Sequence, residues 1–140
     1  MAGIVVGIDG SPESKKALAF AVRIAHLSGD RVRAISVWQY EPSLLTDHDT
    51  RFGVHDRDRL AEARMTAQAE LDTVLPEASA PAPELLVCEG DAAQVLIDES
   101  RDADMLVVGS RGRGRAASAL LGSVSQACAS QAHCPVTVVR

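Results

Sequence analysis

The chain has 140 residues, of which 46% are hydrophobic, and this length fits one globular domain, since domains most often contain about 100 to 150 residues. Aromatic residues make up only 3%, so the core must be built from Val, Leu, Ile and Ala. The formal net charge of −5 argues against broad electrostatic binding to nucleic acid or to an anionic membrane.

The N-terminal part predicts a strand, a tight turn and a helix. Gly3–Asp9 is apolar and β-branched, Gly10 turns the chain, and Ser11-Pro12 is typical of a helix start. We expect this helix to run to about Ser28, because Gly29 favours a C-terminal stop. Its positions with the spacing of a buried face are Leu18, Ala21, Val22 and Ala25.

A second strand, Val32–Trp38, follows a helix that is long enough to place the two strands parallel. Gln39–Val54 contains Pro, Gly and scattered charge and is interpreted as a loop. A second helix is predicted from about His55 to Leu75, just before a proline. Its apolar positions fall on one side, namely Leu60, Ala63, Ala67, Leu71 and Val74.

Leu85–Cys88 is a short apolar strand, and Gly90-Asp91 begins a helix that ends near Arg101. The continuous apolar run Asp104–Gly109 is typical of a central parallel strand that is buried on both faces. The next helix is expected over Ala116–Ala132. Its inward side chains are expected to be Leu120, Leu121, Val124, Ala127 and Cys128.

Pro135 opens a last strand, Val136–Val139, which is either an interior strand or an exposed edge. Five strands alternating with four helices predict a single-domain α/β fold with an open, doubly wound parallel sheet. Ligands bind such sheets beyond the carboxyl ends of the strands, where the strand order reverses. The candidate site therefore includes Asp9–Ser11, Val37-Trp38 and the residues from Gly109 onward.

No apolar run approaches the roughly 18 residues that a membrane-spanning helix needs, so we expect no membrane association. The first residues lack a basic segment, and Gly7 interrupts their apolar stretch, which argues against a secretory signal. The three cysteines, Cys88, Cys128 and Cys134, have no CxxC spacing. We therefore expect reduced thiols and a cytoplasmic protein.

The loop at residues 109–114 contains three glycines and follows the predicted central strand. Glycines let backbone N–H groups approach an anion, and the following helix N-terminus adds positive potential. Residues 105–140 carry four arginines and no acidic residue, although the chain as a whole is acidic. We favour a phosphate-binding loop, with Ser123 and Ser125 within reach, over a connection whose arginines only face solvent.

Several known phosphate and catalytic motifs are absent. Residues 112–117 match G-x-G-x-x-A, but the dinucleotide motif needs an acidic residue about 20 positions later, and none follows Asp104. The only lysines, Lys15 and Lys16, lie in a predicted helix and form no Walker A loop. The chain has no G-x-S-x-G nucleophile elbow. Nothing here indicates a strong catalytic site.

Histidines and the single tryptophan provide weaker candidates. His48 and His55 are flanked by aspartates, but their spacing matches no metal site, and a solvated charged segment is the better interpretation. His26 and His133 are isolated in the sequence. Trp38, at a strand end, either forms a wall of a ligand pocket or packs in the core.

Two segments form a recognisable pattern, namely Gly109-x2-Gly112-x9-Gly122-Ser123 and Gly7–Ser11. The first matches the signature G-x2-G-x9-G-Ser/Thr of the universal stress protein family, in particular of its ATP-binding, UspA-like members, and the second resembles the first strand and turn of that family. The resemblance covers essentially the whole chain. It implies a Rossmann-like sheet of strand order 3-2-1-4-5, similar to the adenine nucleotide alpha hydrolases, with ATP lying across the strand ends.

The resemblance also implies roles for individual residues. Asp9 would lie by the nucleoside, Val37 would meet adenine through its backbone, and Gly109 would lie beside the ribose. Phosphates would be held by Gly112, Gly122, Ser123, Ser125 and the Val124 backbone. The full candidate set is Ile8, Asp9, Val37, Val108, Gly109, Arg111, Gly112, Gly122, Ser123, Val124 and Ser125.

Arg113 and Arg115 stand at positions that are often less charged in the family, and they either pair with phosphates or point to solvent. The sequence thus favours a nucleotide-dependent regulatory or signalling module in the stress response, which binds ATP with Mg²⁺ through the phosphates. Without an evident general base, ATP hydrolysis is expected to be slow at most. The resemblance also favours a homodimer formed through Val136–Val139, if that strand lies at an edge.

Three alternatives stay open at this stage. The first is a dimeric interaction protein that does not use ATP as its physiological ligand. The second is a true nucleotide-hydrolysing or adenylyl-transferring enzyme. The third is a different ligand, because the same phosphate loop accepts cyclic or dinucleotides.

Overall fold

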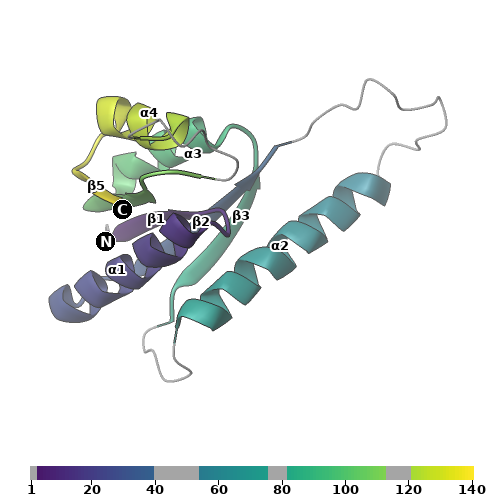
Figure 1. Ribbon diagram of the computed structural model, residues 1–140, viewed down its shortest axis with the longest axis horizontal. Coiled ribbons are helices and arrows are strands. Elements are labelled where there is room, and N and C mark those ends of the chain that lie inside the picture. The colour runs from purple at the N-terminus through teal and green to yellow at the C-terminus, as the bar shows by residue number, and fades with distance from the viewer. Residues whose placement is uncertain (1–2, 40–53, 76–81, 113–120) are drawn as a thin grey trace.

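The computed structural model describes residues 3–39, 54–75, 82–112 and 121–140 (Figure 1). Within these ranges the strands are β1 (Ile4–Ile8), β2 (Val32–Trp38), β3 (Glu84–Glu89), β4 (Met105–Gly109) and β5 (Val136–Val139). The helices of the same ranges are α1 (Pro12–Ser28), α2 (Val54–Val74), α3 (Ala92–Glu99) and α4 (Ser123–Gln131), with a 3₁₀ turn at Ser100–Asp102. The predicted loop between β2 and α2 lies almost entirely outside the described residues.

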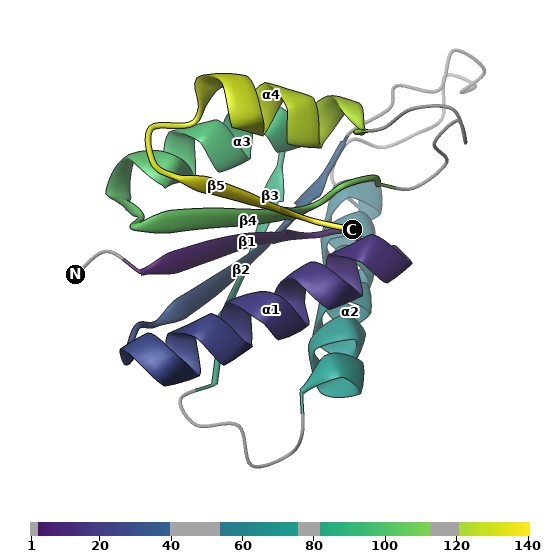
Figure 2. The same ribbon diagram turned by 60° about the vertical axis from the view of Figure 1, so that its left-hand side comes forward.

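The five strands form one parallel sheet in the order β3-β2-β1-β4-β5. This confirms the predicted doubly wound fold and the strand order that the resemblance implied. Helices α1 and α2 cover one face of the sheet, and α3 and α4 cover the other (Figure 2). The strand order reverses between β1 and β4, which are neighbours in the sheet. Ligand sites of such sheets lie at that reversal.

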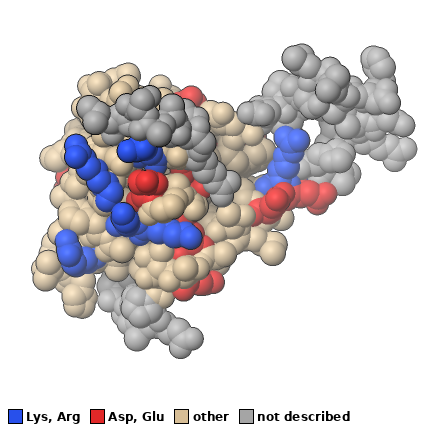
Figure 3. Space-filling view, in the orientation of Figure 1, with Lys and Arg blue, Asp and Glu red and all other residues tan. Residues whose placement is uncertain are grey.

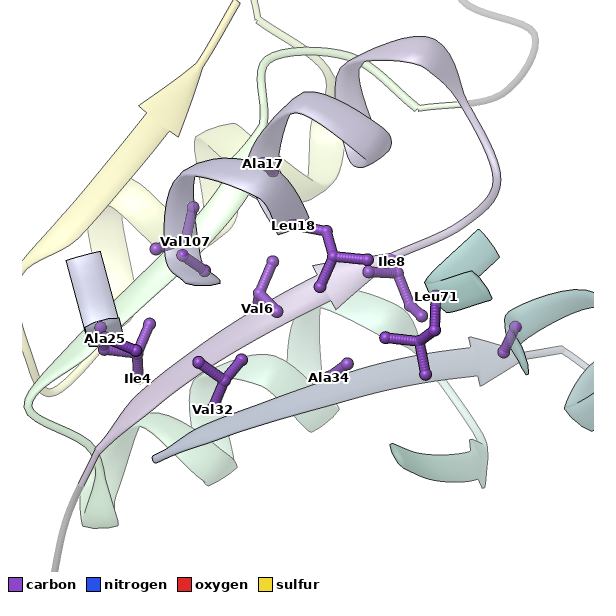
Figure 4. Packing of buried hydrophobic residues seen from close by; sticks show 12 residues of the cluster. Ile4, Val6, Ile8, Ala17, Leu18, Ala25, Val32, Ala34, Leu71 and Val107 are labelled. Atoms are coloured by element: carbon purple, nitrogen blue, oxygen red, sulfur yellow. The ribbon is translucent and has the colours of Figure 1, made fainter. Parts of the chain in front are cut away.

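The two central strands carry the core. Val5 and Val6 of β1 point to opposite faces and are 1% and 0% exposed, and the middle of β4 is buried in the same way. On the face covered by α1 and α2, Leu18 and Leu71 pack around Ile8 (Figure 4). Each large aliphatic side chain buried in this manner contributes about 1.5 to 3 kcal/mol. This packing fixes the carboxyl end of β1 against both helices.

Helix boundaries follow the predicted capping residues. The Ser11 hydroxyl oxygen accepts a 3.1 Å hydrogen bond from the Ser14 N–H at the start of α1. Gly29 ends the helix in the left-handed region, with a φ of 80°. At the start of α3 the Asp91 carboxylate accepts from the Gln94 N–H at 2.9 Å. The capping signals in the sequence are therefore confirmed at α1 and α3.

The side of α2 that carries the predicted apolar positions is well buried only in the second half of the helix. Ala67 and Leu71 are buried and Val74 is half-buried, but Ala63 is only half-buried and Leu60 is 37% exposed. Figure 1 shows the N-terminal part of α2 extending beyond the sheet. Apolar periodicity identifies one side of a helix but does not tell where the covering surface ends.

The last helix starts later than predicted. We expected it from Ala116, but α4 begins at Ser123, and both Leu121 and Gly122 lie before it. Residues 113–120, including Leu120, lie outside the described part of the chain. The apolar spacing continued into this region, whereas Gly122 is extended with a φ of −75° and serves as the N-cap. The remaining predicted inward side chains, Val124, Ala127 and Cys128, do pack in the core.

The cysteines Cys88, Cys128 and Cys134 are free thiols. Burial raises the pKa of the Cys128 thiol to about 11, so this sulfur stays protonated and unreactive at neutral pH. None of the described helices is long and apolar enough to cross a membrane.

Candidate functional site

A cavity of about 260 Å³ opens at the carboxyl ends of β1, β2 and β4. It lies at the reversal of strand order, and its volume is slightly below the range of about 300 to 1,000 Å³ for small-molecule sites. The whole predicted candidate set lines it, namely Ile8, Asp9, Val37, Val108, Gly109, Arg111, Gly112, Gly122, Ser123, Val124 and Ser125. Further lining residues that the sequence did not indicate are Gly7, Ser14, Ile35, Ala92 and Leu96.

The inner part of the cavity is apolar. Ile35, Leu96 and Val108 are at most 3% exposed and belong to the core between the sheet and helices α3 and α4. Leu96 comes close to β1 because Gly7 has no side chain, and a Cβ at Gly7 would lie 2.8 Å from Leu96 Cδ1. Burial against these side chains would favour an apolar or aromatic part of a ligand.

The N-terminus of α4 forms a second, polar wall. Gly122 is the N-cap and has no side chain with which to cap the helix. The N–H groups of Ser123, Val124 and Ser125 belong to the first turn, where backbone donors have no acceptor within the helix. The helix dipole adds positive potential at the same place, so this terminus favours a phosphate group.

The Ser125 side chain is buried and already hydrogen-bonded. Its hydroxyl lies 3.0 Å from two acceptors, the carbonyl oxygens of Ser110 and Gly122. The Gly122 N–H also donates to the Ser110 carbonyl oxygen, at 2.7 Å. These bonds join the end of β4 to the start of α4. In this structure the Ser125 hydroxyl therefore holds the two loop ends together, and the exposed Ser123 hydroxyl is the freer of the two serine donors.

Asp9 and Gly112 face each other across the mouth of the cavity. A Cβ at Gly112 would lie 2.7 Å from Asp9 Oδ2, so only glycine fits there without movement of the aspartate. The neighbouring Arg111 is half-buried and also lines the cavity. The cavity lining thus combines one carboxylate and one cation. Arg113 and Arg115 lie outside the described residues.

A buried glutamate, which was not among the predicted site residues, forms hydrogen bonds to the turn that follows β1. Glu70 of α2 is 4% exposed. Its Oε2 accepts from the Gly10 N–H at 2.7 Å, and its Oε1 accepts from the Ser14 hydroxyl at 2.6 Å. Burial raises the pKa of this carboxyl, while the two hydrogen bonds partly lower it. The available signal was an acidic residue next to Leu71 on the apolar side of a predicted helix.

The weaker candidates that the structure describes, Trp38, His26 and His133, do not line the cavity. Trp38 is not among its lining residues, and the Trp38 indole N–H is buried without a hydrogen-bond partner among the described residues. His26 and His133 are exposed. His48 and the side chain of His55 lie outside the described part, in which no group of His, Cys, Asp or Glu side chains could hold a metal ion.

Charges on the face shown in Figure 3 are mixed. Lys and Arg side chains lie among Asp and Glu side chains, and the described residues of this face form no continuous basic surface. Nucleic-acid binding proteins usually present a basic patch or stripe, so this face does not have the electrostatic character of a nucleic-acid interface.

Comparison with known proteins shows which family this chain resembles. The universal stress protein family model matches residues 2–140. A universal stress protein of Mycobacterium tuberculosis is 38% identical over 140 residues, which is all of this chain and 48% of the relative. The chain thus spans about half the length of the mycobacterial relatives it matches.

Two solved structures have the same fold. A universal stress protein in complex with cAMP is 27% identical with a TM-score of 0.61, and the match covers 99% of this chain and 96% of that one. UspA of Lactobacillus plantarum is 21% identical with a TM-score of 0.75, over 99% of this chain and 97% of that one. Because the family model matches nearly the whole length of this chain, the chain belongs to the universal stress protein family.

Proposed function

We propose that this protein binds ATP and acts as a nucleotide-dependent regulatory or signalling module in the stress response. The observation that carries the proposal is the cavity at the strand-order reversal, because all the candidate residues that are far apart in the sequence line it together. The M. tuberculosis relative and the family model support the stress-protein context of the proposal.

The residues that line the cavity support an adenine nucleotide as its ligand. Its apolar inner part, between Val37 and Leu96, accepts the adenine ring, and the β1 end with Asp9 lies on the nucleoside side. The phosphates reach the first turn of α4 and the guanidinium of Arg111, where backbone N–H groups and a cation stabilise negative charge. The neighbouring family member in complex with cAMP supports an adenine nucleotide as the ligand class.

Magnesium would be held mainly through the phosphates, because Mg²⁺ keeps several waters and usually takes one or two protein carboxylates. Asp9 is the carboxylate that lines the mouth of the cavity, so it is the group that would complete such a site. The Asp9 Oδ1 accepts from the Ser11 N–H at 2.9 Å, and no His, Lys, Cys or second carboxylate is among the described residues that line the cavity, so no positioned general base is evident. We therefore expect binding with slow hydrolysis at most.

A second candidate is a dimeric interaction protein that does not use ATP. It is favoured by β5, which pairs with β4 on one side and lies at the edge of the sheet. An edge strand has backbone N–H and C=O groups that can pair with the same strand of a second copy. A homodimer formed in this way is compatible with either function, so nucleotide binding decides between them.

The test is to denature freshly purified protein, identify any released nucleotide by mass spectrometry, and titrate the stripped protein with ATP and Mg²⁺. We expect released adenine nucleotide close to one per chain, and restored binding on titration. A parallel titration with cAMP distinguishes ATP from a cyclic ligand. No released nucleotide and no binding, together with a stable dimer in sedimentation, would refute the proposal in favour of the interaction protein.

A further inference from the structure

The turn between β1 and α1 is held by a buried carboxylate from another part of the chain. Glu70 lies in the second half of α2 and is 4% exposed, so its carboxylate has been removed from most of its water. Burying a carboxylate is costly unless hydrogen-bond donors replace the water. Both oxygens receive such a donor from the turn, the Gly10 N–H at 2.7 Å and the Ser14 hydroxyl at 2.6 Å.

The two bonds to Glu70 are the end of a chain of hydrogen bonds. The Ser14 hydroxyl oxygen accepts from the Asp9 N–H at 2.9 Å, and Asp9 Oδ1 accepts from the Ser11 N–H at 2.9 Å. Three successive backbone donors, at Asp9, Gly10 and Ser11, are thereby satisfied by side chains. Gly10 itself adopts a φ of 81°, which glycine reaches without steric cost and other residues do not. The geometry of the turn depends on these contacts.

The turn forms part of the cavity wall. Asp9 and Ser14 line the cavity, and Asp9 Oδ2 lies against the Cβ-free face of Gly112. A shift of the turn would move Asp9 relative to the loop after β4, so the shape of the mouth would change. Glu70 is not among the lining residues and reaches the cavity only through Gly10 and Ser14.

We propose that Glu70 is a positioning residue of the nucleotide site, which fixes the β1–α1 turn from α2 and so holds Asp9 in its place. The inference rests on the proposed function, since it concerns the affinity of that same site. It also makes α2 part of the site: any displacement of the second half of this helix pulls on the Gly10 and Ser14 contacts. The nucleotide site and α2 are then coupled, and each responds to changes in the other.

The test compares three variants of the full chain. Glu70→Ala removes both contacts, while Glu70→Gln keeps an oxygen for the Gly10 N–H and an amide that donates to the Ser14 hydroxyl oxygen. The control is Ala67→Gly, which weakens the same buried face of α2 but removes no side-chain hydrogen bond to the turn. We expect ATP affinity to fall about tenfold in Glu70→Ala, within the usual range of coupling between sites, and to be recovered in Glu70→Gln.

A second readout does not depend on nucleotide. Amide hydrogen exchange should become faster at Asp9 and Gly10 in Glu70→Ala, and should stay slow in Glu70→Gln and in Ala67→Gly. Equal affinity and equal exchange in Glu70→Ala and Ala67→Gly would overturn the inference. If the wild-type protein binds no ATP, the proposed function and the role of Glu70 in binding both fail. The exchange result still decides whether Glu70 holds the turn.

Discussion

Replacement of Gly122 by valine tests the central wall of the site. A Cβ at this position would lie 3.4 Å from the Arg111 Cα, 3.5 Å from the Ser110 carbonyl oxygen and 3.6 Å from the Gly112 nitrogen. These are close but ordinary contacts, so Gly122→Ala fits with small adjustments. Valine adds two methyl groups to a Cβ that already contacts residues 110–112. We therefore expect residues 110–112 to move away from the start of α4.

The expected loss of ATP affinity follows from the backbone N–H donors that this movement would displace from the phosphates. Loss of two first-turn N–H bonds to phosphate, at about 1.5 kcal/mol or more each, corresponds to a loss of affinity of about 100-fold or more. Overpacking costs about 1 to 3 kcal/mol of stability, which is less than the 5 to 15 kcal/mol, roughly, of an ordinary domain. We therefore expect Gly122→Val to fold and to lose measurable ATP binding, with a smaller loss in Gly122→Ala.

Calorimetric titration with ATP and Mg²⁺ measures the affinity, and circular dichroism with a urea melt checks the fold. Ala129→Val is the matched control, because Ala129 is an exposed residue of the same helix and receives the same β-branched side chain. Unchanged affinity in a folded Gly122→Val protein would refute the placement of the phosphates at the start of α4.

Further outcomes follow from the core and from the buried carboxylate. Leu18→Ala, at a side chain that is 0% exposed, should lower the free energy of unfolding by about 2 to 5 kcal/mol in urea melts. Leu27→Ala, at a side chain of the same helix that is 77% exposed, should change that free energy by less than about 0.5 kcal/mol. Gly10→Ala should cost roughly 1 to 2 kcal/mol in the same melts, because the φ of 81° is unfavourable for alanine. The pKa of Glu70 is raised in the folded state by burial and by Asp9, against the lowering effect of its hydrogen bonds and of Lys15. Between pH 4.5 and the raised pKa, the Glu70 carboxyl is therefore protonated to a greater extent in the folded protein than in the unfolded chain. The contribution of Glu70 to the free energy of unfolding falls as the pH rises through this window. Urea melts across this window should show that slope in the wild type and a weaker slope in Glu70→Gln, and parallel slopes would contradict the raised pKa.

The fold was predictable because its signals are local. The caps at Ser11, Gly29 and Asp91 act on the next few residues, and the apolar run of β4 needs only its own sequence to identify a central strand. Regular alternation of strands and crossover helices then restricts the topology to a few parallel arrangements. Gly122 shows the limit of such signals. The helical spacing of apolar residues continues on both sides of this glycine, and so the helix was predicted to begin at Ala116 although α4 begins at Ser123.

The candidate site was predictable where one segment carries the pattern. Gly112 and Gly122 belong to one signature, and strand ends meet at one edge of any parallel sheet. Leu96 and Ser14 line the same cavity for a different reason, namely that α3 and α1 happen to approach it. Glu70 is the clearest case, because its partners Gly10 and Ser14 lie 60 and 56 residues earlier. Periodicity within α2 contains no information on such distant contacts.

The uneven covering of α2 gives this helix two regions of different local stability. From residue 57 to residue 66 only Ala63 is even half-buried, whereas Ala67, Glu70 and Leu71 are buried. An isolated helix shorter than about 12 to 15 residues is marginal in water, so the outer turns persist mainly because they extend a segment that is already packed. Fraying should therefore start at the N-terminal end and stop near Ala67, one turn before Glu70.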